Sequence, residues 1–422
     1  MIRDITLDGF KAVSERVTIP LRDFTVLIGR NSSGKSSIIE GLEWLSDCLN
    51  EGAASATRQF RRIQDLLFSG RNSFLIGLNF DPRDLSVGGT VRYEMRVGNA
   101  QGAPAITEES LIYEEGTEVR SRIQTIEGAR EYVLALKGAI SKRDRELLRK
   151  RAQGDQQSQP IESVLFALDA LEAQQLSASS NPNEALLRVV DPKVDRGGSL
   201  LRDTLANAVF LSLSPKAIAE FSDTSEALGS SRLLDKQGQM VARLLAQLDT
   251  EALQILTEKV GFITGRTTVC DVHAPQGPAD RRYFQFNESV AGGLAPIPGW
   301  MLSEGTRRIT AILALLLSDP PPPLICIEEI ENGLDPWTIK FMLEELASAA
   351  VGGVQIIVTT HSPFLLNQVP LENVLLVDRS GDRMRAAPCK TADDLQTVSA
   401  HMGAGDMYVG RYLHDALRKG SN

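Results

Sequence analysis

The first fifty residues pass from strand-like to helix-like spacing of apolar positions. Apolar residues recur at short intervals over residues 1–20, and Phe24–Ile28 is then continuously apolar. A continuous run of this length indicates a strand buried on both faces. After Lys35 the apolar positions form one helical stripe, made by Ile38, Ile39, Leu42 and Leu45. The pattern predicts a strand, a glycine-containing turn and a helix in direct succession.

The middle of the chain changes character. Residues 74–126 contain short strand-like runs separated by glycine and proline turns. Residues 129–257 read instead as helical, with polar linkers between the helices. The helix candidates there are residues 141–151, 161–176 and 235–248. We therefore expect three segments, an N-terminal part with a β-rich lobe (1–128), a helical insertion (129–257) and a C-terminal part (258–422).

The final third alternates between helix and strand. Strands are expected at 262–290, after which ITAILALLL, LICIEE, WTIKFMLEELA and VQIIVTTH read as helix, strand, helix and strand. This alternation predicts a parallel sheet covered by helices, with the two ends of the chain forming one α/β domain. Residues 371–388 are expected to form a terminal hairpin, followed by a short helical tail.

Composition sets broad limits. Of the 422 residues, 42% are apolar and 23% charged, as in ordinary globular proteins. No apolar run reaches the roughly eighteen residues of a membrane helix, and the N-terminus does not resemble a signal peptide. The scattered cysteines lack metal-ligand spacing, so we expect free thiols, a cytoplasmic location and no membrane partner. A net charge of −9 argues against a generally basic nucleic-acid-binding surface, but it is compatible with a local one.

Candidate chemistry begins in the turn after Phe24–Ile28. The sequence GRNSSGKSS satisfies the phosphate-loop pattern GxxxxGK[ST]. Its backbone amides can cradle phosphates at a helix N-terminus, Lys35 can reach the outer phosphates, and Ser36 can hold Mg²⁺. A chance glycine turn is the alternative, and the flanking strand and helix patterns argue against it. The expected nucleotide-binding residues are Gly29, Arg30, Asn31, Ser32, Ser33, Gly34, Lys35, Ser36 and Ser37.

A second candidate is LICIEEIENGLDP, residues 324–336. A buried strand ends there in Glu328 and Glu329, and ligands bind at the carboxyl ends of strands in open parallel sheets. Glu328 is expected to bind Mg²⁺ through water, and Glu329 to polarise an attacking water. Acids at a strand end are usually only solvated, but their pairing with a phosphate loop favours catalysis. Such motifs mostly carry Asp first, so Glu328 departs from the pattern.

Three further features accompany the loop and the acid pair. LSEGTRR places Ser303 at the N-cap of a long apolar helix and Gly305 in its first turn, where free amides can bind an anion. Asp335 can cap the helix after the acid pair. His361 stands at the tip of the next strand, where an imidazole can reach a phosphate or the attacking water. Each alone would indicate an ordinary cap or a structural histidine; their order favours a function.

Phosphate loop, LSxG signature, acid pair, D-loop and switch histidine, in that order, resemble an ABC-type ATPase head. The opening DGFKAVSERVTIPLRDFTVLIGRNSSGKSS and LSEGTRR are similar to the SMC/RecF/OLD-like group, which includes compact prokaryotic AAA ATPases often found in antiphage defence modules. The resemblance covers residues 1–45 and about 295–368. It implies an α/β fold with a mixed or parallel sheet core, an N-terminal β-rich lobe and an inserted helical region.

The resemblance also implies a mechanism. ATP with Mg²⁺ would bind the loop, and Ser303 and Gly305 of one subunit would complete the site of a second copy. Asp335 would lie near the interface of this homodimer or higher even oligomer. Hydrolysis assisted by Glu329 and His361 would separate the heads, so the nucleotide would act as a switch on self-association.

Two roles remain open. A sensor or scaffold ATPase that controls a separate effector protein, in antiphage defence, is favoured by the acidic charge and modest size. The alternative is a RecF-like repair ATPase that clamps DNA through a basic surface of its own. Two basic clusters could contact phosphates, although a solvated surface is the slightly favoured interpretation of both. These clusters are Lys137–Arg151 and the group Arg58, Arg61 and Arg62. A transporter subunit fits less well, because LSEGT replaces LSGGQ.

Nuclease activity is not expected. OLD-family nucleases continue past the switch histidine into a metal-binding Toprim domain, whereas this chain ends at residue 422. Asp378 and Asp382 flank a predicted turn, and we expect no further role for them.

Overall fold

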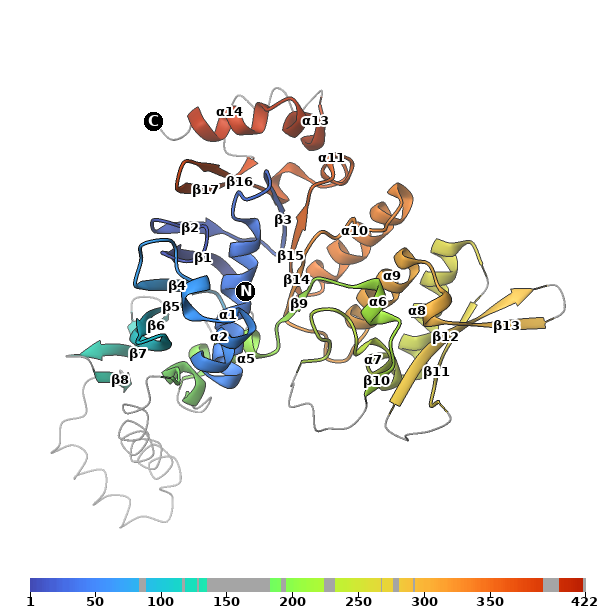
Figure 1. The fold of residues 1–422 in the computed structure, drawn as a ribbon, viewed down its shortest axis with the longest axis horizontal. Coiled ribbons are helices and arrows are strands. Elements are labelled where there is room, and N and C mark those ends of the chain that lie inside the picture. Colours follow the sequence, from blue (N-terminus) through green and yellow to red (C-terminus); the bar gives the residue numbers. More distant parts are fainter. Residues whose placement is uncertain are drawn as a thin grey trace, which may run out of the picture. The chain divides into compact units, whose positions relative to one another are not determined.

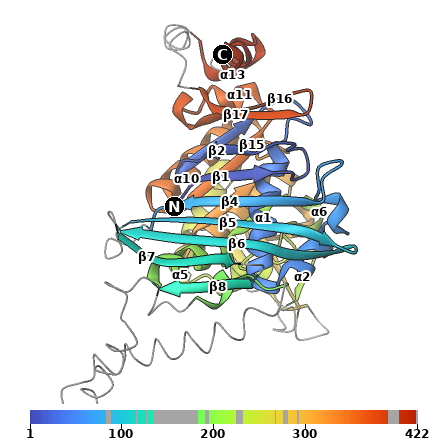
Figure 2. The ribbon, with the colours of Figure 1, turned by 90° about the vertical axis from the view of Figure 1, so that its left-hand side faces the viewer.

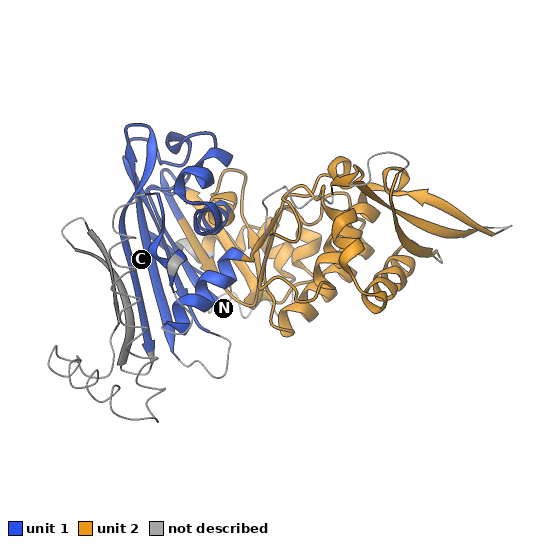
Figure 3. Cartoon of the chain, turned by 90° about the horizontal axis from the view of Figure 1, so that it is seen from below, with its two compact units in different colours: residues 1–20, 40–206, 380–384 blue, residues 21–39, 207–379, 385–422 orange. Residues whose placement is uncertain are grey.

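The structure, a computed structural model, consists of two compact units, shown in different colours in Figure 3. It describes residues 1–82, 89–115, 118–126, 129–134, 183–190, 195–223, 232–266, 268–275, 281–290, 293–389 and 402–419. Unit 1 comprises residues 1–20, 40–206 and 380–384, and unit 2 comprises residues 21–39, 207–379 and 385–422. Each unit has a large sheet of its own.

Unit 1 is built on a seven-stranded antiparallel sheet of order β2-β1-β4-β5-β6-β7-β8 (Figure 2). Its strands are β1 (Ile2–Asp8), β2 (Val17–Pro20), β4 (Ser73–Phe80), β5 (Thr90–Ala100), β6 (Ala103–Glu115), β7 (Glu118–Ile126) and β8 (Ala129–Leu134). Its helices are most of α1 (Lys35–Glu51), α2 (Ala53–Gln59), η1 (Ile63–Asp65), η2 (Leu186–Val189) and α5 (Arg196–Ala206). Trp44 of α1 meets Phe74 of β4 edge-on, with ring centroids 5.1 Å apart. The predicted β-rich segment is thus confirmed.

Unit 2 holds a six-stranded sheet of order β17-β16-β3-β15-β14-β9 (Figure 1). The strands from β16 to β9 run parallel. They are β3 (Phe24–Ile28), β9 (Val209–Leu211), β14 (Leu324–Ile327), β15 (Gln355–Thr360) and β16 (Val374–Ser380), with β17 (Arg383–Pro388) completing the predicted hairpin. Every residue of β3 is buried, as its continuous apolar run predicted. Because β3 pairs with β15 and β16, the predicted joining of the two chain ends in one parallel sheet is confirmed.

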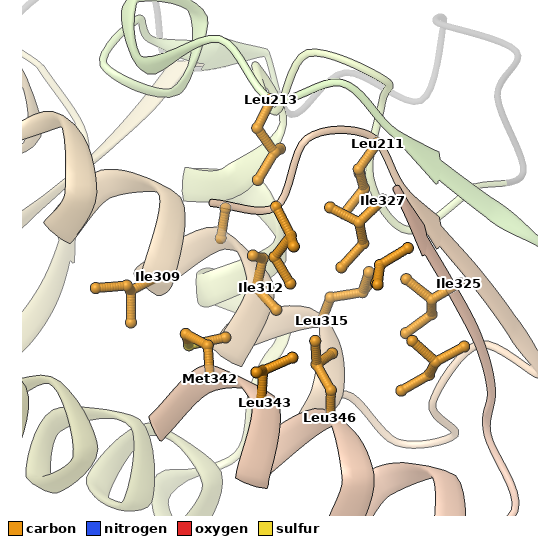
Figure 4. Packing of buried hydrophobic residues seen from close by; sticks show 14 of the residues in the cluster. Leu211, Leu213, Ile309, Ile312, Leu315, Ile325, Ile327, Met342, Leu343 and Leu346 are labelled. Atoms are coloured by element: carbon orange, nitrogen blue, oxygen red, sulfur yellow. The ribbon is translucent and has the colours of Figure 1, made fainter. Parts of the chain in front are cut away.

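Helices cover this sheet and form a continuous apolar core with it. Buried leucine, isoleucine and methionine side chains of α9 (Glu304–Leu316) and α10 (Pro336–Val351) pack against those of β9 and β14 (Figure 4). The other helices of unit 2 are α6 (Pro215–Ile218), α7 (Val241–Gln247), α8 (Thr250–Thr264), η4 (Gly299–Met301), α11 (Pro363–Leu366), η5 (Leu371–Asn373), α13 (Ala404–Val409) and α14 (Tyr412–Lys419). The packing holds the polar strand ends of β3, β14 and β15 on a rigid base.

A smaller sheet belongs to the same unit. It joins β10 (Ser222–Asp223), β12 (Arg281–Val290), β11 (Thr268–His273) and β13 (Gly293–Pro298) in antiparallel pairs. The strands expected at 262–290 are therefore confirmed. β13 leads through η4 into α9, so this sheet directly precedes the signature sequence.

The three-segment organisation predicted from the sequence stays a prediction. Within 129–257, the helix candidates at 141–151 and 161–176 lie outside the described residues. The described part contains α5, α6, α7 and the start of α8, but also β8 in the antiparallel sheet and β9 in the parallel one. β9 was not expected, because a buried run of only three residues carries no readable period.

Candidate functional site

The phosphate loop connects β3 to α1. Ser32 and Gly34 have positive φ angles of 64° and 107°, a backbone conformation found in anion-binding nests. Gly29 leaves no room for a side chain, because a Cβ there would lie 2.0 Å from the carbonyl oxygen of Val377 in β16. The Ser33 hydroxyl is buried and has no hydrogen-bond partner among the described residues. The loop therefore has the backbone shape and a spare polar group for an anionic ligand.

Lys35 supplies the buried positive charge of this loop, whereas Arg30 is exposed. Its side chain is buried, and its Nζ donates to the carbonyl oxygens of Gly29, at 2.7 Å, and Arg30, at 3.1 Å. Burial lowers the pKa of the Lys35 ammonium, while the charges of Glu329 and Glu331 oppose this shift. The lysine after β3 thus lies in the electric field of the acids after β14.

Glu329 is held in an unusual backbone conformation. Its φ is 48°, a left-handed value that costs a non-glycine residue roughly 1 kcal/mol or more. The Glu329 amide donates to Thr359 Oγ1 of β15 at 2.9 Å, and its carboxylate accepts from Asn332 Nδ2 at 2.6 Å. The neighbouring Glu328 is half-buried, and its amide donates to the carbonyl of Leu211 in β9 at 2.8 Å. The Glu329 carboxylate is therefore exposed at the strand end and held by Asn332, while the backbone of Glu328 is held by β9.

Glu331 is a site residue that the sequence reasoning missed. Its Oε1 accepts from the backbone amide of His361 at 2.6 Å, while its Oε2 is buried without a hydrogen-bond partner among the described residues. This carboxylate fixes the position of the exposed His361 and also acts on Lys35. The sequence feature that could have indicated Glu331 is its position two residues after Glu329.

The signature sequence packs against the D-loop (GLDP, Gly333–Pro336) of the same chain. Ser303 caps α9, as predicted, and its hydroxyl accepts from the Thr306 amide at 3.1 Å. A Cβ on Gly305 would lie 2.7 Å from the carbonyl oxygen of Gly333, so only glycine permits this approach. Arg308, also missed from the sequence, has a buried Nε without a partner among the described residues. Burial lowers the pKa of its guanidinium, opposed by Glu304 and Glu329.

Asp335 caps α10, as predicted. Its Oδ1 accepts from the amides of Trp337, at 3.0 Å, and Thr338, at 3.1 Å, and its Oδ2 accepts from the Thr338 hydroxyl at 2.5 Å. The Thr338 hydroxyl bond is the main reason that the pKa of this carboxyl is lowered. Ser303, Gly305 and Asp335 line one pocket of about 400 Å³. None of the phosphate-loop residues is among those that line it.

The predicted residues thus form two groups within unit 2. The first group contains Lys35 of the loop, Glu329, and His361, whose backbone is bound by Glu331. Ser303, Gly305 and Asp335 belong to the second. Of the other loop residues, Arg30, Asn31 and Ser36 are exposed and Ser37 is buried.

Only one of the two basic clusters considered as nucleic-acid contacts lies within the described residues. Residues 137–151 are outside the described part of the chain. Arg58, Arg61 and Arg62 are exposed on unit 1, where Arg62 pairs with Asp65 at 3.2 Å.

Comparison with known proteins identifies the family. Residues 24–367 match the family described as "AAA domain, putative AbiEii toxin, Type IV TA system". The chain belongs to this family. Within the described parts of the chain, no helix combines the length and apolar character needed to cross a bilayer.

Individual proteins are similar to parts of the chain. The chain is 27% identical over 157 residues to the chromosome partition protein Smc of Halobacteriovorax marinus, covering 33% of this chain and 12% of that protein. It is 38% identical over 69 residues to the cytochrome c biogenesis ATP-binding export protein CcmA of Paramagnetospirillum magneticum, covering 16% of this chain and 31% of that one. The matches thus span well under half of these relatives.

A solved structure shows the same fold. The Smc head bound to the C-terminal winged-helix domain of ScpA superimposes with a TM-score of 0.52 at 16% identity, covering 92% of this chain and 97% of that one. This likeness confirms the expected α/β head fold, and the family match places an AAA domain over residues 24–367.

Proposed function

We propose that this protein is an ATPase that binds ATP with Mg²⁺ in order to pair two copies of itself, and that pairing controls a separate effector protein. One observation carries the proposal. Three neighbouring parallel strands, β3, β15 and β14, bring the Lys35 ammonium under the influence of Glu329 and Glu331. A buried cation, a spare hydroxyl and an exposed carboxylate in one place suit the binding and hydrolysis of a nucleoside triphosphate.

Each residue has a proposed task. Lys35 and the loop amides would balance the phosphate charge, with the Ser33 hydroxyl as a further donor. Ser36 and Glu328 offer the oxygen ligands that Mg²⁺ prefers, and the bound ion would neutralise charge between the phosphates. Glu329 would orient the attacking water and accept its proton, and His361 would donate toward the outer phosphate.

Pairing is proposed because the group formed by Ser303, Gly305 and Asp335 has no phosphate loop beside it. Ser303 and Gly305 present the N-terminus of a thirteen-residue helix, which favours an anion, in a pocket that no phosphate-loop residue lines. A nucleotide held by a second copy would supply that anion. The site of each copy would then be completed by the other.

The effector role rests on the family. Its description names a toxin of a type IV toxin–antitoxin system, which favours action within a module of several proteins. A place for that module in antiphage defence is proposed from the sequence resemblance alone. A DNA-clamping repair ATPase is the second candidate, favoured by the exposed Arg58 and Arg61 on unit 1. ATPase activity stimulated by bare duplex DNA would favour this candidate.

Hydrolysis of ATP tests the assigned chemistry. Glu329→Gln keeps the side chain's size but removes its basicity, so we expect a loss of turnover of roughly 10²–10⁴-fold with nucleotide binding retained. Lys35→Ala should abolish nucleotide binding itself. Turnover and binding are measured by phosphate release and by equilibrium dialysis. Undiminished turnover in Glu329→Gln protein would remove this residue from the mechanism.

A further inference from the structure

Unit 2 contains another pocket, of about 820 Å³, that is distinct from the pocket lined by Ser303, Gly305 and Asp335. The two share no lining residue, and no phosphate-loop residue lines either of them. The wall of this 820 Å³ pocket is formed by the segment from α6 to β10, the turn before α7, the start of β12, and η4. The residues that matter here are Glu220, Phe221, Asp223, Asp235, Arg281 and Trp300.

Exposed aromatic side chains form one side of this pocket. Phe221 is 39% exposed and Trp300 is 46% exposed. Their rings and that of Tyr283 contact one another, with centroid distances of 5.3 Å for Tyr283–Trp300 and 5.8 Å for each of the other pairs. Aromatic groups kept open to solvent beside a concavity are typical of binding surfaces.

The charge around these rings is negative. The described lining residues contribute three carboxylates, those of Glu220, Asp223 and Asp235, and the single guanidinium of Arg281. Glu220 is exposed, and its Oε2 accepts from Gln239 Nε2 at 3.2 Å, a neutral donor that leaves its charge in place. Negative charge disfavours a phosphate-bearing ligand. An aromatic face beside a carboxylate instead suits an arginine or lysine side chain, through cation–π contact and ion pairing.

We propose that this pocket docks a segment of a partner protein that carries an arginine or lysine. The cationic side chain lies against Trp300, and Glu220 provides the opposite charge.

The pocket lies next to α9, the helix that begins with the signature sequence. Trp300 lies three residues before Ser303, in η4. Arg307 of α9 donates from Nη1 to the carbonyl of Pro215, at 2.6 Å, and from Nε to that of Leu302, at 3.1 Å. The bond to Pro215 joins α9 to α6, which leads into Glu220 and Phe221. An occupant of the pocket would therefore contact η4, which precedes the signature sequence, and the segment after α6, which is hydrogen-bonded to α9. Any effect on nucleotide pairing rests on the proposed function, whereas docking does not.

Fluorine NMR of protein labelled with 5-fluorotryptophan tests the docking. The chain contains three tryptophans: Trp300 in the pocket, Trp337 exposed elsewhere in unit 2, and the buried Trp44 of unit 1. The probes are a capped hexapeptide of alternating Arg and Gly, the corresponding Glu–Gly peptide, and the oligonucleotide dT6. No nucleoside triphosphate is added, so a failure of ATP binding cannot be the cause of absent peptide binding.

We expect the Arg–Gly peptide to shift the Trp300 resonance saturably while Trp44 and Trp337 stay unchanged. Glu220→Gln should weaken this binding at least fivefold, and Glu258→Gln, an exposed change on α8 outside the pocket, should not alter it. The Trp337 resonance shows whether unit 2 of each variant remains folded. The proposal is overturned by an unmoved Trp300, by an equal response to the Glu–Gly peptide or to dT6, or by undiminished binding in folded Glu220→Gln protein.

Discussion

Glu331 joins two parts of the site that are separate in the sequence. One carboxylate oxygen accepts from the His361 amide, and the charge of the group reaches the buried Lys35 ammonium. A glutamine could keep the first interaction but would lose the second. The two contributions can therefore be separated by experiment.

The pH dependence of nucleotide binding tests this role. Burial lowers the pKa of Lys35, so its charge is present below this lowered pKa and is lost as the pH rises through it. Affinity for ATP should fall over the same range. Because Glu331 raises this pKa, Glu331→Gln should move the fall to lower pH and weaken binding there by roughly threefold to tenfold. Isothermal titration calorimetry of ATP binding between pH 7 and 10 measures this shift in affinity.

The matched control is Glu344→Gln, which removes an exposed carboxylate of α10. It should leave the pH profile of ATP binding in place. If Glu331→Gln and Glu344→Gln gave the same profile, the electrostatic role of Glu331 would be wrong.

The loop residues could be predicted because their pattern is local. Glycine spacing, a lysine and a serine between a buried strand and a helix suffice to define a phosphate loop. Glu331 and Arg308 could not be found in this way. Their importance depends on contacts between β14, β15 and α9, which are distant in sequence and meet only in the fold.

At the scale of elements, the start of α9 lies very close to the D-loop. Gly305 is the residue that allows this, since a Cβ would lie 2.7 Å from the backbone oxygen of Gly333. A backbone oxygen cannot rotate away as a flexible side chain does. Either α9 or the D-loop would have to move.

Gly305→Ala should therefore destabilise the protein by about 1–3 kcal/mol, the usual cost of overpacking. Urea unfolding followed by circular dichroism measures the change. Gly352→Ala is the control, because Gly352 has an ordinary φ of −71° and its nearest neighbour would lie 3.3 Å from a new Cβ. A Gly305→Ala protein as stable as its parent would contradict the close packing of α9 on the D-loop.

The elements of unit 2 were mostly predictable because their patterns are long or flanked by clear turns. β3, α9, β14, α10 and β15 all occur where apolar period and capping residues placed them. β9 was missed because Val209–Leu211 is too short to show a period, and only its pairing with β14 makes it a strand. Local pattern thus predicts elements, whereas pairing partners decide short strands.

At the scale of the whole molecule, the two groups of site residues belong to one unit but line different places. Lys35 and Glu329 belong to the proposed nucleotide site, and Ser303, Gly305 and Asp335 line a pocket to which no phosphate-loop residue contributes. Such an arrangement is understandable if a second copy completes each site. Pairing driven by ATP is therefore the central claim.

The most direct test is the mass of Glu329→Gln protein in solution, with and without ATP and Mg²⁺. Slowed hydrolysis should trap the paired state, so we predict that ATP doubles the mass by light scattering. Ser303→Arg, added to the same protein, should still bind ATP but remain single, because the bulky side chain blocks the signature helix from a partner's nucleotide. Glu329→Gln protein that is saturated with ATP and yet keeps its nucleotide-free mass would contradict the account.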